Sequence, residues 1–302
     1  MTRHGTLILC YHRVAENVED PFWLCVSPGN FSAHLEEIAK AREPSTLADL
    51  SVPSRRPRVV VTFDDGYRDN LANALPIAES KGVPITVFVA SGVLGSGSGF
   101  WWDRLGALLR SRPPNVREIE LPVGGRSVRL PVGSSGIRAD LDSVRRVLLP
   151  HRVAEIERAL AAVAEQWQVS SAPPADAGTL TTEDLGRLAA SDCVTIGAHT
   201  VDHARLSDRP AEEQGTTIAD SKRELERSIG QGVSHFAYPF GGHDDFDQRS
   251  VSAVRSAGFD TACTTIPGTA RSSADPYLLP RRLVMDWGRL RFLAQLQRWK
   301  IG

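Results

Sequence analysis

The sequence has few cysteines, no long apolar run and almost no net charge. Its 302 residues carry 35 basic and 36 acidic side chains, so no excess of charge favours nucleic acid or an anionic membrane as a partner. No apolar run approaches the ~20 residues of a membrane span, and the apolar stretch before Tyr11 is too short for a signal-peptide core. These absences predict a cytoplasmic protein with no membrane span.

The four cysteines are Cys10, Cys25, Cys193 and Cys263, and they form no CxxC pair. Paired spacings of that kind are typical of zinc sites and redox motifs. A chain of 302 residues, 41% of them hydrophobic, is long enough to build a large core without disulfides. We therefore expect reduced cysteines that serve packing.

Short apolar runs alternate with helical patterns along the chain, which favours parallel βα units. The predicted strands are 6–11, 58–63, 85–90, 193–198, 234–238, 260–265 and 281–285. Predicted helices cover 27–41, 181–192 and 210–230, with Ser27 or Asn30 as the N-cap of the first. The pattern over 70–82 contains Pro76, which predicts a loop or a kink in its first half.

Residues 101–180 interrupt this rhythm. The stretch 117–132 alternates and turns at Gly124-Gly125, which predicts a hairpin. Helical patterns over 138–148 and 151–168 follow, and then a Ser-, Ala- and Pro-rich linker at 170–178. We interpret 101–180 as a mixed hairpin-plus-helix insertion within a single catalytic domain that spans 1–302.

Three predicted strands run directly into reactive side chains. The strand 58–63 is followed by Asp64 and Asp65, the strand 193–198 by His199, and the strand 6–11 by His12. Active sites of α/β barrels are built at the carboxyl ends of the strands. The shared position of these side chains therefore indicates one site.

The motif "HTVDH" places His199 and His203 four residues apart. In a helical or turn-like segment both rings point the same way, as two ligands of one metal ion must. A structural or surface role is the alternative for such a pair. Asp65 would complete a set of two histidines and one carboxylate with an open coordination position, as in catalytic zinc sites.

The Asp64-Asp65 doublet has two interpretations. It can be a plain polar turn before Gly66. If Asp65 binds a cation, however, the cation offsets the repulsion between the two carboxylates and leaves Asp64 available as a base. The histidine pair favours the second interpretation.

With these residues in place, the chain resembles the polysaccharide deacetylase family, which shares the NodB homology domain (carbohydrate esterase family 4). The motifs "TFDDG" (62–66), "HTVDH" (199–203) and "YPFG" (238–241) carry the resemblance, with support from "CYHRV" (10–14), "FWWDRL" (100–105) and "LPR" (279–281). The resemblance implies a distorted (β/α) barrel and metal-dependent removal of acetyl groups from N-acetylated sugars.

The resemblance also implies roles for individual residues. Asp64 would be the general base, Asp65, His199 and His203 the metal ligands, and the backbone N–H of Phe240 a donor to the oxyanion. Many members have an arginine shortly before the third-motif proline and a C-terminal histidine as general acid, and both are absent here. Arg281 is a candidate replacement for the arginine. The circularly rearranged members, with an N-terminal "YH" motif, make His12 the candidate acid, although a histidine after a strand can also be purely structural.

The expected reaction is amide hydrolysis, in which Asp64 takes a proton from water and His12 protonates the departing amine. The donor set suits Zn²⁺, with Co²⁺, Ni²⁺, Mn²⁺ and Fe²⁺ as alternatives. Candidate substrate contacts are Trp101, Trp102, Asp103 and Tyr238. Trp101 and Trp102 can instead pack the insertion onto the barrel, and Asp103 can instead cap the next helix.

The expected substrate is a lipid-linked or nucleotide-linked sugar, a glycan or a glycoside. Three alternatives stay open. One is an amidase of the same fold acting on a small cyclic amide or ureide, and another is a non-catalytic sugar-binding module. The third is a two-histidine, one-carboxylate iron oxygenase, which would not need Asp64.

Overall fold

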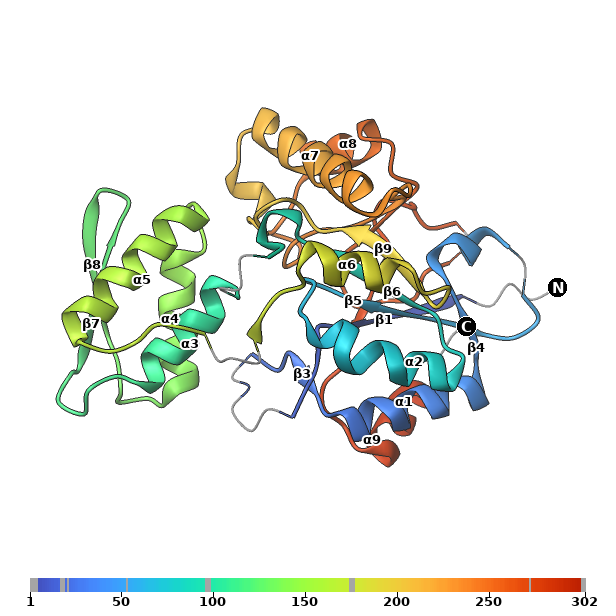
Figure 1. The fold of residues 1–302 in the computed structure, drawn as a ribbon, viewed down its shortest axis with the longest axis horizontal. Coiled ribbons are helices and arrows are strands. Elements are labelled where there is room, and N and C mark those ends of the chain that lie inside the picture. The colour runs from blue at the N-terminus through green and yellow to red at the C-terminus, as the bar shows by residue number, and fades with distance from the viewer. Residues whose placement is uncertain are drawn as a thin grey trace. The chain divides into compact units, whose positions relative to one another are not determined.

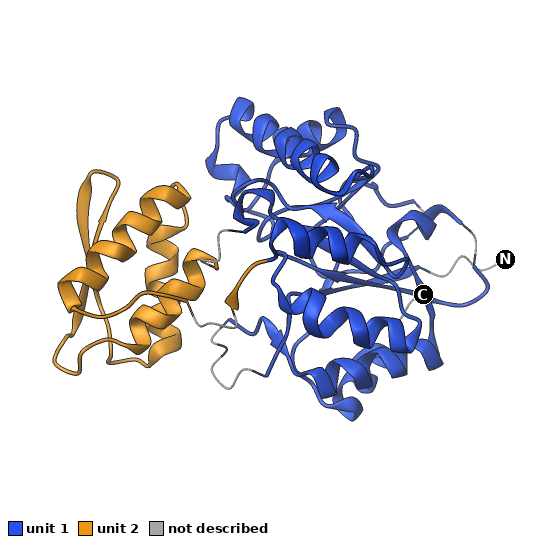
Figure 2. Ribbon diagram, in the orientation of Figure 1, with its two compact units in different colours: residues 1–95, 180–302 blue, residues 96–179 orange. Residues whose placement is uncertain are grey.

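The computed structural model describes residues 5–16, 20, 22–52, 54–95, 99–173, 177–271 and 273–299. Within these ranges the chain divides into two compact units, one formed by residues 1–95 and 180–302 and the other by residues 96–179 (Figure 2). No helix among the described residues is both long and apolar enough to span a membrane.

The first unit is built on one parallel sheet in the order β11-β10-β9-β6-β5-β1-β12, and β4 also pairs with β5. Figure 1 labels β9, β6, β5, β1 and β4 of this sheet. The strands are β1 (Thr6–Tyr11), β4 (Glu43–Ser45), β5 (Arg58–Phe63), β6 (Ile85–Val89), β9 (Val194–Ala198), β10 (His235–Ala237), β11 (Thr261–Cys263) and β12 (Arg282–Leu283). β4 pairs with the first half of β5, and β6 pairs with the second half. A small pair of strands, β2 (Arg13–Val14) and β3 (Cys25–Val26), follows β1.

The sheet is curled into a partial barrel. Ile8 of β1, Phe88 of β6 and Cys263 of β11 belong to one buried cluster although their strands are far apart in the sheet order. The neighbouring residues Leu7, Leu9 and Tyr11 belong to the other, larger cluster, which includes helix residues. Because successive side chains of a strand point to opposite faces, one face of the sheet forms the barrel interior and the other packs against helices. The predicted α/β fold of the distorted barrel type is confirmed.

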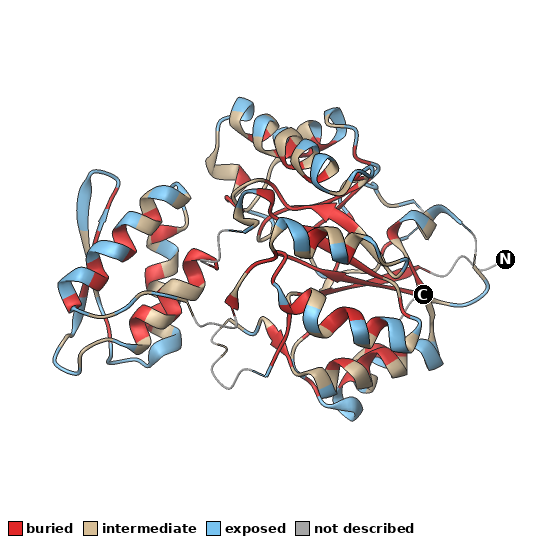
Figure 3. Cartoon of the chain, viewed as in Figure 1, coloured by how far each residue is buried: buried red, intermediate tan, exposed pale blue. Residues whose placement is uncertain are grey.

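Helices cover the outer face of the sheet, and their buried sides face it (Figure 3). They are α1 (Pro28–Ala41), α2 (Leu75–Lys81), α6 (Thr182–Ala189), α7 (Ala211–Ile229), α8 (Gln248–Ser256) and α9 (Arg289–Arg298). The Ser27 hydroxyl accepts a hydrogen bond from the Asn30 backbone N–H, which makes Ser27 the N-cap of α1. α7 ends at Gly230, whose left-handed φ of 68° suits a C-cap glycine.

Each end of the seven predicted strands agrees with the structure within two residues. The segment 70–82 is neither a plain loop nor a plain helix. Its first five residues form the π-helical turn η2 (Asn70–Ala74), and α2 follows with Pro76 in its first turn, where proline costs no hydrogen bond. The helices α8 and α9 and the short strands β2, β3 and β4 were not predicted.

The second unit contains α3 (Trp101–Arg110), the hairpin β7 (Glu118–Val123) and β8 (Arg126–Pro131), α4 (Ile137–Leu148) and α5 (Val153–Trp167). The hairpin turns at Gly124 and Gly125, which both have positive φ, as predicted. β7 alternates between buried and less buried residues, with Ile119, Leu121 and Val123 buried. This unit therefore has a small core of its own.

Candidate active site

The reactive side chains gather because strand alternation and parallel pairing act together. Tyr11 pairs with Phe63, so β1 and β5 end at the same level. Cys10 and Thr62 are next to these residues, on the interior face, and His12 and Asp64 continue that alternation. β6 pairs with β9, and His199 follows β9 directly. The predicted cluster at the carboxyl ends of the strands is therefore present.

Asp65, His199 and His203 form a compact set of buried side chains. Their potential ligand atoms all lie within 4.8 Å of one another. Nε2 of His203 is 3.1 Å and Nε2 of His199 is 3.6 Å from Oδ1 of Asp65. His199 Nδ1 lies 2.7 Å from the Ala237 carbonyl oxygen, to which it donates, so Nε2 is the nitrogen directed to the set. Such a hydrogen bond is the usual way in which a metal-binding imidazole is oriented.

The protonation states also suit a metal site. Burial lowers the pKa of His199 to about 4, so the ring is neutral near pH 7, as a ligand must be. Burial opposes ionisation of Asp65, but His203 and the other nearby histidines outweigh it and hold the pKa of Asp65 below its ordinary value. The set therefore offers the neutral His199 nitrogen and the Asp65 carboxylate beside Nε2 of His203.

The "HTVDH" segment is a turn and not a helix. Thr200 and His203 both have positive φ, 64° and 54°, and the Thr200 hydroxyl accepts from the His203 backbone N–H at 3.1 Å. Asp65 (φ 77°) and Phe240 (φ 60°) also lie in the left-handed region. Positive φ is unfavourable for residues other than glycine and is concentrated at functional sites. Backbone strain thus marks the same place as the ligand geometry.

Asp64 is held by a fully buried arginine. Nη1 and Nη2 of Arg281 donate to the two carboxylate oxygens of Asp64, each at 2.6 Å. Arg281 also donates to the Thr62 hydroxyl and to the Thr264 carbonyl oxygen. Burial would raise the pKa of Asp64, but Arg281 and then His199 overcome that effect and hold the pKa well below its usual range. The structure therefore brings Arg281 to Asp64, and the role of Arg281 in orienting a base stays a prediction.

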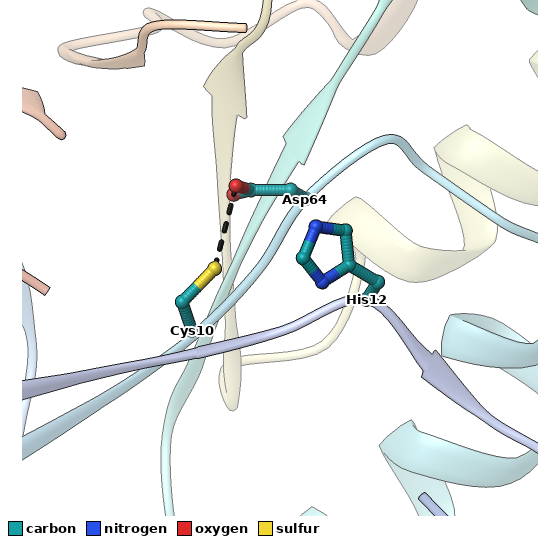
Figure 4. Close-up of side chains that lie close together, drawn as sticks. All are labelled: Cys10, His12 and Asp64. Atoms are coloured by element: carbon teal, nitrogen blue, oxygen red, sulfur yellow. Dashed lines mark hydrogen bonds between the residues drawn. The ribbon is translucent and has the colours of Figure 1, made fainter. Parts of the chain in front are cut away.

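Cys10, His12 and Asp64 form a second group, shown in Figure 4. The buried Cys10 thiol donates to Oδ2 of Asp64 at 3.4 Å, and burial raises the pKa of this thiol well above its ordinary value. The potential ligand atoms of the group lie within 4.8 Å of one another. Because Arg281 already binds both oxygens of Asp64, this group is better suited to proton transfer than to a cation. The contact of Cys10 with Asp64 was not predicted, although all four cysteines are free as expected.

Phe240 borders the histidines. Its ring lies edge-on to that of His203, with centroids 4.8 Å apart. Its carbonyl accepts from the Thr265 hydroxyl at 2.6 Å, which fixes the peptide that follows. A Cβ on the next residue, Gly241, would lie 2.8 Å from the Thr265 backbone nitrogen, so only glycine fits this turn. The backbone at Phe240 is therefore held rigidly beside the candidate ligands.

The candidate substrate contacts are placed differently. Tyr238 is fully buried, and its hydroxyl donates to the Tyr277 carbonyl oxygen. Trp101 and Trp102 are buried in the second unit, where Trp102 stacks on Phe100. Asp103 accepts from the Phe100 backbone N–H at the start of α3. These contacts are those of packing and helix capping, so their role in substrate binding stays a prediction.

A cavity of about 1060 Å³ lies away from this cluster. It is lined by Thr6, Arg58, Thr195, His235 and Thr261 among others, which are at or next to the first residues of their strands. It is therefore at the amino ends of the strands, opposite Asp64 and the histidines. Its lining contains no set of two histidines and a carboxylate.

The fold and the site agree with the match of this chain to known proteins. Residues 51–120 and 156–262 match the polysaccharide deacetylase family, and they make up more than half of the chain. The chain belongs to the polysaccharide deacetylase family. The match includes Asp64, Asp65, His199, His203 and Phe240 and leaves out residues 121–155 of the second unit.

Relatives of known sequence or structure are similar over most of the chain. YxkH of Bacillus subtilis (strain 168), assigned to the polysaccharide deacetylases, is 28% identical over 281 residues, 91% of this chain and 69% of YxkH. The Streptococcus pyogenes deacetylase PplD, solved with acetate, has a TM-score of 0.63 at 18% identity, over 99% of this chain and 100% of that one. IcaB from Ammonifex degensii has a TM-score of 0.62 at 17% identity, over 98% of this chain and 97% of that one. At these identities the solved structures establish a shared fold.

Proposed function

We propose that this chain is a metal-dependent N-deacetylase that hydrolyses the acetamide of an N-acetylated sugar. The observation that carries the proposal is a carboxylate held by a buried arginine beside a separate set of two histidines and one carboxylate. Family membership supports carbohydrate deacetylation, and the paired Asp64 and Asp65 give each carboxylate its own task. A sugar-binding module or an iron oxygenase would not need the pairing of Asp64 with Arg281.

The Asp65, His199 and His203 set fits a divalent cation. The three donors are close enough to share one ion, and two nitrogens with one carboxylate suit Zn²⁺, with other first-row divalent ions as alternatives. When bound, such an ion supplies Lewis acidity toward water and toward the acetamide carbonyl.

The protein residues supply positioning and proton transfer. Asp64 is ionised and oriented by Arg281, so it can accept the proton of the attacking water. The backbone N–H of Phe240 is the proposed donor to the oxyanion. His12, within reach of Asp64, is the proposed acid that delivers a proton to the departing amine. Residues 101–180, which largely coincide with the second compact unit, are proposed to be an insertion in this one catalytic domain.

Acetate release tests the proposal. Zinc-reconstituted wild type is expected to release acetate from N-acetylhexosamine oligomers, nucleotide sugars or glycosides, and the responding class identifies the substrate. Asp64→Asn should lose this turnover by at least about a hundredfold yet still bind one zinc ion, because Asp64 lies outside the ligand set. Acetate release that persists in Asp64→Asn would refute the assignment of the base. Zinc binding without acetate release from any sugar would favour a non-sugar amide substrate.

A further inference from the structure

The segment that follows the Asp64-Asp65 doublet folds back onto the backbone next to His12. It reads "GYRDN" (66–70) and leads into the π-helical turn η2. π-Helical turns are rare and occur preferentially at functional sites. Asp69, just before this turn, and Asn70 and Asn73 within it contact residues 12–14. None of these three side chains had a predicted role.

The contacts to residues 12–14 are specific and mostly buried. Nδ2 of Asn70 donates to the His12 carbonyl oxygen at 2.9 Å, and Asn70 is fully buried. Asp69 accepts from the Val14 backbone N–H at 3.1 Å and from Nε of Arg13 at 2.8 Å. Nδ2 of Asn73 donates to the Val14 carbonyl oxygen at 2.7 Å. Three side chains from one turn therefore fix the peptide groups that follow His12.

The imidazole of His12 is oriented in a different way from that of His199. Nδ1 of His12 is buried, and none of the residues that the structure describes forms a hydrogen bond with it. His199, by contrast, has its Nδ1 bonded to a backbone carbonyl. Because no hydrogen bond fixes Nδ1, the placement of the His12 ring depends more strongly on its backbone, which Asn70 holds through the His12 carbonyl.

We propose that Asp69, Asn70 and Asn73 are positioning residues for the general acid His12. This inference rests on the proposed deacetylase function. One continuous segment, residues 64–73, then supplies the base, one metal ligand and the support of the acid. Acid and base are then held in a fixed relation, because Asp64 belongs to this segment and the backbone of His12 is hydrogen-bonded to it. A small displacement of a catalytic group is enough to lower its rate substantially.

The test compares two substrates that differ in their need for an acid. An acetamide releases an amine, which must be protonated, whereas 4-nitrophenyl acetate releases a phenolate that leaves without a proton. Asn70→Ala and Asn73→Ala should lower kcat on the acetamide by about ten- to a hundredfold and change kcat on the aryl ester by less than about threefold. His12→Ala should show the same selectivity with a larger loss, about 10²- to 10⁴-fold.

Gln214→Ala is the matched control. Gln214 is a fully buried amide that donates to the Arg209 carbonyl and accepts from the Ser250 hydroxyl, and neither partner belongs to the groups around Asp64 and Asp65. Its loss should lower the Tm comparably without changing the ratio of the two activities. The double variant His12→Ala/Asn70→Ala should be no slower on the acetamide than His12→Ala, because both changes remove the same contribution, that of the His12 side chain.

The measured losses distinguish a positioning role of these residues from a purely structural one. Equal losses on both substrates in Asn70→Ala and Asn73→Ala, or additive losses in the double variant, would overturn the positioning role. If Asn70→Ala does not fold, the less buried Asn73→Ala decides by the same ratio. Aryl ester hydrolysis by a wild type that releases no acetate from any acetamide would refute the proposed function itself, and the role of His12 with it.

Discussion

Replacing Arg281 by methionine should destabilise the first unit strongly. Arg281 is fully buried, and two of its nitrogens bind Asp64, which is itself 3% exposed. Removing one partner of a buried ion pair leaves the other charge without compensation, which costs about 3–5 kcal/mol. Arg281→Met should therefore lower the free energy of unfolding by that amount at pH 7.

The loss of stability in Arg281→Met should depend on pH, and the pKa of Asp64 sets the direction of that dependence. In the wild type the folded pKa of Asp64 lies below its ordinary value, so its contribution is present above the ordinary carboxyl pKa and is lost as the pH falls below it. Without Arg281, burial raises the folded pKa instead. The difference in free energy of unfolding between wild type and Arg281→Met should then shrink as the pH falls from 7 to 5, because Asp64 becomes protonated in the variant.

Urea denaturation of the metal-free proteins at pH 7 and pH 5 measures these differences. The double variant Arg281→Met/Asp64→Asn should be more stable at pH 7 than the sum of the single losses predicts, by about 0.5–3 kcal/mol. A loss below about 1 kcal/mol in Arg281→Met, or strict additivity in the double variant, would show that the pair carries no such coupling.

Two further predictions concern the core. Burial lowers the pKa of His34 from 6.5 to about 4, so stability should fall by about 3 kcal/mol as the pH drops through this window; thermal unfolding across pH should show this slope, and a His34→Gln variant with the same slope would contradict it. A Cβ on Gly197 would lie 2.4 Å from the Phe88 ring, so Gly197→Ala should cost about 1–3 kcal/mol. Gly215→Ala, in α7 with nothing within 4 Å of its added Cβ, should instead stabilise the protein by about 0.5–1 kcal/mol, and equal effects of the two substitutions would refute the packing argument.

The sequence predicted the parts of the site that depend on strand ends. A strand with apolar runs ends where polar residues begin, so the positions of His12, Asp64 and His199 at one edge followed from alternation and parallel pairing. The relation of Asp65 to the histidine pair was predicted as well, because three donors of the right type were all at strand ends or the turn beside them.

The parts that the sequence did not predict depend on contacts between distant segments. Arg281 is 217 residues from Asp64. Only the family resemblance made it a candidate, because no local pattern shows that its side chain enters the barrel. The contact of Cys10 with Asp64 required the register of β1 against β5. The π-helical turn at Asn70–Ala74 lies where Pro76 made the local pattern ambiguous, although Asp69 and Asn70 directly follow the motif that led to the site.

A zinc titration of metal-stripped protein, with acetate release as the readout, tests the proposed metal site of a deacetylase. We expect no turnover in the stripped protein, activity that rises linearly and saturates at one equivalent of zinc, and no recovery in His203→Ala. Full acetate release by the stripped protein, or by His203→Ala, would contradict the assignment of Asp65, His199 and His203 as the metal site of a deacetylase.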